Sequence, residues 1–215
     1  MKRNQSGFTL IEIAIVLVVI GLMMGGVLKG QSMIDNAKVK ALSNEFGSIQ
    51  SMVNAYQDKF RALPGDDNAA TTHLTGATQA TAAGTGTLDT GTWVGATAPD
   101  TGNKSSLFWQ HVRLAGLAIG ASTSGEANNA LGGKLGVTTN AAHVNIPATV
   151  GGAFTACSSA IPGKIAKPLD IMMDDGKPDS GAMVAAKETS GAIVAATAAD
   201  SSFADKDLYT VCLAF

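Results

Sequence analysis

The chain has 215 residues, enough for one domain with an appended element. Only 5% of the residues are aromatic and 15% are charged, so we expect a core built largely from small side chains. The formal net charge of −2 argues against a nucleic-acid-binding protein that relies on a basic surface.

The N-terminal region combines a short basic start with a long apolar run. Lys2 and Arg3 lie within residues 1–7, and residues 8–28 read FTLIEIAIVLVVIGLMMGGVL with a single charge, Glu12. About 20 apolar residues span the hydrocarbon of a bilayer as a helix. Positive charge before the run and a long polar chain after it predict a cytoplasmic N-terminus and an exported C-terminus. The run is too long for an ordinary secretory signal.

Glu12 is the unusual feature of this run. A carboxylate inside a membrane helix costs roughly 2.5–3.5 kcal/mol on insertion scales, so such a group is usually functional. The stretch SGFTLIE at residues 6–12 resembles the signature of type IV prepilins and type II secretion pseudopilins. In that family a membrane peptidase cuts after the glycine and N-methylates the new first residue. The resemblance implies processing between Gly7 and Phe8.

The same resemblance implies how the processed chain would assemble. The Glu12 carboxylate of one subunit would meet the Phe8 amine of a neighbour, which offsets the desolvation cost of both groups. The implied partners are identical or related subunits in a filament, the prepilin peptidase, an inner-membrane platform and an assembly ATPase. The implied location is the inner membrane, as a single-pass protein, and after assembly an extracellular pilus or a periplasmic pseudopilus.

The helix is predicted to continue through residues 29–62. Apolar residues recur there at alternating steps of three and four, which gives the helix one apolar stripe. The stripe favours a packed head that begins near Val39, and a coiled-coil seam is the alternative. Pro64 ends the helix. The stripe consists of Val39, Leu42, Phe46, Ile49, Val53, Tyr56, Phe60 and Leu63.

Residues 63–215 are predicted to form the globular head. Residues 68–103 are rich in Thr, Ala and Gly and favour surface loops with short strands, anchored by Trp93. A short amphipathic helix is predicted at residues 105–117, capped by Ser105 or Ser106. The expected fold is therefore α+β: a long N-terminal helix, membrane-spanning in its first half, packed against a C-terminal antiparallel sheet. The predicted strands are His143–Ile146, Ala182–Ala186, Ala192–Ala196 and Leu208–Phe215.

Two cysteines, Cys157 and Cys212, are too few for a disulfide scaffold and lack the spacing of a zinc site. In an exported protein we expect one bridge between them, and in a cytosolic protein two buried thiols. The bridge would match the disulfide-bounded C-terminal region of many type IV pilins, by position.

The densest acidic cluster lies at residues 170–179. Calcium takes six to eight oxygen ligands, often carboxylates and loop carbonyls, and some secretion pseudopilins hold calcium in a C-terminal loop. We therefore consider a calcium site formed by Asp170, Asp174, Asp175 and Asp179. The alternative is a pair of turns with solvated carboxylates. No other cofactor is expected.

The sequence gives little indication of catalysis. No two of His73, His111 and His143 have the spacing of metal ligands, and no GxSxG or P-loop motif occurs. The adjacent Asp66 and Asp67 are expected to point apart. We predict a non-enzymatic structural subunit of a type IV pilus or pilus-like filament. The alternatives are a minor pilin or pseudopilin of a type II secretion system, a monomeric membrane-anchored metal- or ligand-binding protein, and a secreted enzyme.

Overall fold

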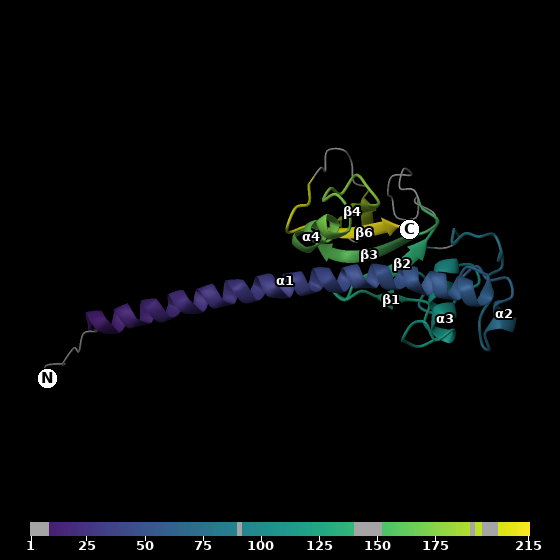
Figure 1. Ribbon diagram of the computed structural model, residues 1–215, viewed down its shortest axis with the longest axis horizontal. Helices are drawn as coiled ribbons and strands as arrows, with labels where there is room; N and C mark the ends of the chain where they lie inside the picture. Colours follow the sequence, from purple (N-terminus) through teal and green to yellow (C-terminus); the bar gives the residue numbers. More distant parts are fainter. Residues whose placement is uncertain (1–8, 90–91, 140–151, 190–191, 195–201) are drawn as a thin grey trace, which may run out of the picture. The chain divides into compact units, whose positions relative to one another are not determined.

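The computed structural model describes residues 9–89, 92–139, 152–189, 192–194 and 202–215. The chain divides into two compact units, Met1–Ala37 and Lys38–Phe215, and we call the second unit the head. One helix, α1 (Leu10–Phe60), runs through both units (Figure 1). Its first part forms most of the described portion of the first unit, and its second part belongs to the head.

Both ends of α1 have an identifiable cause. At the start, the Glu12 N–H donates to the Thr9 hydroxyl (3.3 Å), so Thr9 satisfies one of the free amides of the first turn. At the other end, Arg61 adopts a left-handed backbone conformation with φ 54°. The helix therefore stops at Phe60, two residues before the predicted end at Ala62.

Within the described residues, the head combines the second part of α1 with three shorter helices and a six-stranded sheet. The strand order is β1-β2-β3-β6-β4-β5, and every neighbouring pair is antiparallel. This arrangement confirms the predicted α+β class. The remaining elements are α2 (Ala70–His73), α3 (Lys104–Leu114), β1 (Ala127–Asn128), β2 (Lys134–Thr138), β3 (Thr155–Pro162), α4 (Gly163–Met173), β4 (Met183–Thr189), β5 (Ala192–Val194) and β6 (Leu208–Ala214).

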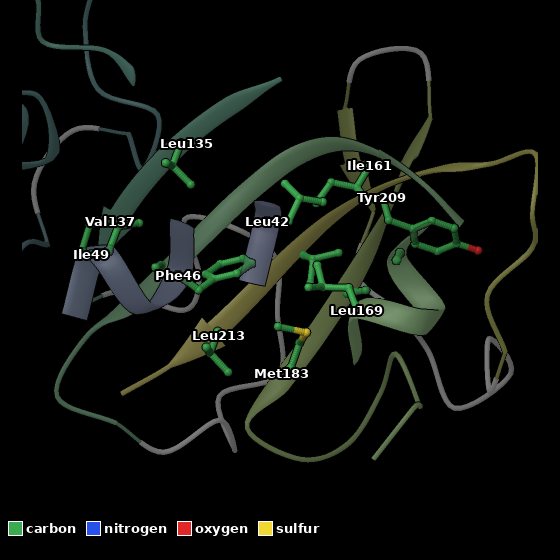
Figure 2. Close-up of a cluster of buried hydrophobic side chains, with 14 of the residues drawn as sticks. Leu42, Phe46, Ile49, Leu135, Val137, Ile161, Leu169, Met183, Tyr209 and Leu213 are labelled. Carbon is green, nitrogen blue, oxygen red and sulfur yellow. The ribbon is translucent and has the colours of Figure 1, made fainter. Parts of the chain in front are cut away.

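The apolar stripe of α1 fills the core of the head. Its first six members are at most 3% exposed, whereas Phe60 and Leu63 are only half-buried. Alternate residues of β6, among them Tyr209 and Leu213, point to the same core, as expected for side chains that alternate across a strand. Figure 2 shows Phe46 of α1 among side chains of the sheet and of α4. The stripe therefore packs against the head, and the coiled-coil alternative does not describe this part of the helix.

A smaller apolar cluster lies apart from that core. It contains Cys157 and Cys212, which form a disulfide between the paired strands β3 and β6. Trp93 packs against the pair and is 4% exposed, so it is the anchor that was predicted for its loop. A Cβ atom at Gly136 of β2 would collide with the Trp93 carbonyl oxygen, so this position requires glycine.

Several predicted elements differ from the structure. The helix predicted at residues 105–117 is α3, and Asn103 rather than a serine caps it, because its side chain accepts from the Ser106 N–H (3.2 Å). The described part of residues 68–103 holds the short helix α2 and no strand. The strands predicted at residues 182–186 and 208–215 correspond to β4 and β6, with shifted ends, and β5 matches the described part of the strand predicted at residues 192–196. Strands β2 and β3 and helix α4 were not predicted, and His143–Ile146 lies outside the described residues.

Candidate functional site

The first part of α1 is apolar on every side. All residues from Thr9 to Lys29 are exposed within the described structure, and they include 14 large apolar side chains between Leu10 and Leu28. The most apolar 18-residue window has a mean hydropathy of 2.6 and no buried residue. A helix that is apolar all round is a membrane span or the core of a larger body. This one is long and apolar enough to cross a membrane.

The energetic consequence is large. A Val, Leu, Ile or Met side chain gains roughly 1.5–3 kcal/mol when it is fully removed from water. For 14 such side chains the total is on the order of 20 kcal/mol or more, which exceeds the usual stability of a whole domain. The segment therefore requires lipid or the apolar surfaces of other chains around it.

Glu12 is the one charged residue of this apolar segment. It lies in the first turn of α1, where the positive end of the helix dipole favours a carboxylate. Thr9 and Glu12 have the spacing of a capping box, and the Thr9 half of that motif is present. The Thr-x-x-Glu pattern at residues 9–12 is the sequence signal of this cap, and it was not among the predicted features. Gly7 and Phe8, the predicted processing residues, lie outside the described residues.

Residues 2–28 match the family model described as the prokaryotic N-terminal methylation motif. This match confirms the resemblance of the N-terminal segment to the processing signature of type IV prepilins and pseudopilins. The match covers the predicted leader and the apolar part of α1, and it ends before the head begins at Lys38. No curated protein and no solved structure matches the chain.

The head contains a buried ion pair that was not predicted from the sequence. The Lys104 Nζ lies 2.8 Å from the Asp66 Oδ1, and both side chains are at most 2% exposed. Asp66 also accepts from the backbone N–H groups of Gly84 (3.1 Å) and Gly86 (2.5 Å) and from the Thr85 hydroxyl (3.3 Å). The pair therefore fixes loop 84–86 to the start of α3. Nothing in the local sequence pattern indicated that Lys104 is buried.

Asp67 points away from Asp66, as predicted, into a second network. Its carboxylate accepts from the Tyr56 hydroxyl (2.8 Å) and the Ala69 N–H (2.8 Å), and the His73 Nδ1 lies 2.6 Å away. Burial raises the pKa of Asp67, but these hydrogen bonds outweigh it and hold its pKa below the usual value. Burial and the neighbouring Asp67 carboxylate raise the pKa of Tyr56. The network joins the end of α1 to α2.

His111 is a buried histidine whose two ring nitrogens both contact backbone groups. Its Nδ1 accepts from the Gly65 N–H (3.0 Å), and its Nε2 lies 2.8 Å from the Thr78 carbonyl oxygen. This pattern requires the neutral ring with the proton on Nε2. Burial lowers the pKa of His111 against the opposing effect of the Thr78 carbonyl. His143 lies outside the described residues.

The four aspartates considered for calcium do not come together at one point. Asp170 is buried in α4, where its Oδ1 accepts from the Gly176 N–H (2.6 Å). Asp174 accepts from the Met183 N–H (2.9 Å), and Asp175 accepts from the Ser180 hydroxyl (2.6 Å).

Among the described residues no group of three His, Cys, Asp or Glu side chains could hold a metal ion. Three of the carboxylates instead hold the loop that follows α4. Asp170, Asp174, Asp175 and Asp179 as calcium ligands stay a prediction.

Proposed function

We propose that the chain is a structural, non-enzymatic subunit of a type IV pilus or a related pilus-like filament. The proposal is carried by one observation: the apolar segment Leu10–Leu28 of α1 is exposed on all sides, and its single charge, Glu12, lies in the first turn of the helix. In this proposal the prepilin peptidase cleaves after Gly7 and methylates Phe8. The Leu10–Leu28 segments then leave the inner membrane together and pack against one another as the filament core.

The charge of Glu12 favours the transfer of the subunit from lipid to the filament. In lipid an unpaired carboxylate is costly, and the amine that cleavage creates at Phe8 is equally costly. Bringing the Glu12 carboxylate of an incoming subunit to the Phe8 amine of a subunit already in the filament compensates both charges. The assembled state is then favoured over a lone subunit in lipid. An inner-membrane platform and an assembly ATPase would supply the work of extraction.

Two measurements test the proposal. Mass spectrometry of the mature N-terminus should find a chain that begins at methylated Phe8. An uncleaved Met1 would favour a monomeric anchored protein, and a cut beyond Gly26 would favour a secreted one. Electron microscopy of sheared cell-surface material should then show filaments that contain the chain.

The role of Glu12 is tested by substitution. Glu12→Gln removes the charge and keeps a side chain that suits the first turn of α1. We expect normal membrane insertion and processing, with loss of filaments. Asp205→Asn, which removes an exposed carboxylate of the head, is the matched control and should leave filaments intact. Filaments of normal abundance from the Glu12→Gln variant would contradict the proposed role.

The abundance of the chain separates the two family roles. A major subunit should be the principal protein of the sheared fraction. A minor pilin, or a pseudopilin of a type II secretion system, should be a trace component or remain in the envelope fraction, and deleting it should block secretion or filament initiation.

A further inference from the structure

A groove of about 830 Å³ lies beside the last turns of α1 in the head. Its volume falls within the range of small-molecule binding sites. Its lining has three parts, which we call the α1 wall, the rim and the floor. The α1 wall comes from the last turns of α1, the rim from Asn68, Gly84 and Gly86, and the floor from Leu63 and the apolar residues beside the ends of β3 and β6. The groove is separate from the apolar segment that the proposed function uses.

Three side-chain amides and the carboxylate of Asp58 form the α1 wall. Gln50, Asn54 and Gln57 follow one another at steps of four and three, so they lie on one face of the helix. All three are exposed, whereas Val53 and Tyr56 of the neighbouring face fill the core. Each amide can donate and accept hydrogen bonds at the same time. The wall is therefore suited to a ligand whose groups also both donate and accept hydrogen bonds.

The formal charges along the groove are balanced. The lining contains one carboxylate and one guanidinium, Asp58 and Arg61, and its second carboxylate, Asp66, is paired with the buried Lys104, whose Nζ also lies 3.5 Å from Asp89. A phosphate, a nucleic acid or a metal ion would require a clear excess of one sign. The balance favours an uncharged ligand. Arg61 reaches the groove through its left-handed backbone conformation (φ 54°), which a residue other than glycine rarely adopts.

The rim opposite the amides is held in place before any ligand arrives. The Gly84 and Gly86 N–H groups, in loop 84–86, donate to the buried Asp66 carboxylate, which is itself paired with Lys104. A rim fixed in this way loses little freedom on binding. The buried Asp66–Lys104 ion pair lies outside the apolar segment of α1, and it holds loop 84–86 in position at the groove.

The floor supplies an apolar and partly aromatic surface. Leu63 is half-buried there, and the rings of Phe154 and Phe215 stack with centroids 5.2 Å apart. Phe154 is buried, whereas Phe215 keeps part of its surface exposed. The groove therefore offers hydrogen-bonding groups on its sides and an apolar face below, the pattern of a site for a small polar ligand.

We propose that this groove binds a short neutral oligosaccharide. Sugar hydroxyl groups donate and accept, so they match the amides of Gln50, Asn54 and Gln57. The C–H face of a pyranose ring would pack on Phe215, and the absence of ionised groups matches the balanced charge of the walls. The proposal does not depend on polymerisation, because the groove lies wholly within the head.

The test uses the full chain reconstituted in phospholipid vesicles, which avoids glycoside detergents. Saturation-transfer NMR would be recorded with maltotriose, mannotriose and chitotriose, and with sialyllactose as an anionic sugar. We expect transfer to at least one of the three neutral sugars and none to sialyllactose. Asn54→Ala should weaken that binding by about fivefold or more, since a lost hydrogen bond to a ligand has effects of that order.

Asn44→Ala is the matched control, because Asn44 is an exposed asparagine of the same helix that lies outside this groove. It should leave the affinity unchanged, and far-UV circular dichroism should show that both variants stay folded. Three results would overturn the proposal: no transfer to any neutral sugar, transfer to sialyllactose alone, or equal loss of affinity in the two variants. Because vesicle-held subunits are used, these results are independent of whether the chain forms filaments.

Discussion

Replacing Lys104 by methionine removes the positive partner of the buried ion pair in the head. The Asp66 carboxylate then stays buried with hydrogen bonds from Gly84, Gly86 and Thr85 but without a compensating charge. Methionine fills nearly the same volume, so the change isolates the electrostatic effect. We expect Lys104→Met to destabilise the head strongly.

The expected magnitude follows from the burial of the pair. Breaking a buried pair by removing one partner costs roughly 3–5 kcal/mol. The head spans residues 38–215, and for a domain of this size each 1 kcal/mol lowers the unfolding temperature by roughly 2–4 °C. Lys104→Met should therefore lower the midpoint by roughly 6–20 °C. The Lys134–Glu126 pair is closer, at 2.6 Å, but the Lys134 side chain is 41% exposed. Lys134→Met should cost at most about 1 kcal/mol.

Tryptophan fluorescence measures this effect without interference from the apolar segment. The chain contains two tryptophans, Trp93 and Trp109, and both are buried in the head. Thermal unfolding of the wild type, Lys104→Met and Lys134→Met would be compared in phospholipid vesicles. Adding Asp66→Asn to Lys104→Met removes the uncompensated charge and should recover part of the loss. Equal losses in the two lysine variants, or no recovery in the double variant, would refute the reasoning.

Three further predictions concern the head and use the same fluorescence assay. Burial raises the pKa of Asp170 to about 7, so the folded state favours its neutral form, and stability should fall as the pH rises from about 4 through 7. Asp170→Asn should remove this decline, which is worth up to about 4 kcal/mol, and a decline that persists in the variant would assign it to another group. Replacing Cys157 and Cys212 by serine opens a crosslink with a sequence separation of 55 residues and should cost about 4 kcal/mol, measured against the oxidised wild type. Phe46→Ala should cost about 3–5 kcal/mol, because Phe46 is fully buried, whereas Met24→Ala in the apolar segment should leave the head midpoint unchanged.

The parts of the fold that were predictable are those with a simple physical pattern. The alternating steps of three and four from Val39 to Tyr56 identified the buried stripe of α1, because a helix with one apolar face needs a surface to pack on. The pairing of Cys157 with Cys212 followed from an exported location and from having only two cysteines.

The elements that were not predicted have sequences without a clear hydrophobic periodicity of a strand or a helix. Strand β3 consists mainly of small residues, and its pairing is interrupted between Ser158 and Ile161, where Ala160 has φ 58°. A bulge of this kind breaks the alternation by which strands are recognised. Helix α4 begins directly after Pro162 and contains Pro168, which favours a loop interpretation. The buried charges of Asp66 and Lys104 were missed for another reason, since only tertiary contacts distinguish them from solvated residues.

This contrast explains why the two units of the chain give different kinds of information about function. A segment that crosses a bilayer must have a minimum length and must be apolar along that length. Such constraints leave a short motif that sequence comparison detects within residues 2–28. The head must only be soluble and folded, and many sequences satisfy that requirement. Its particular role therefore depends on surface chemistry such as the amide-lined groove, and binding measurements on the head will determine that role more directly than the N-terminal motif.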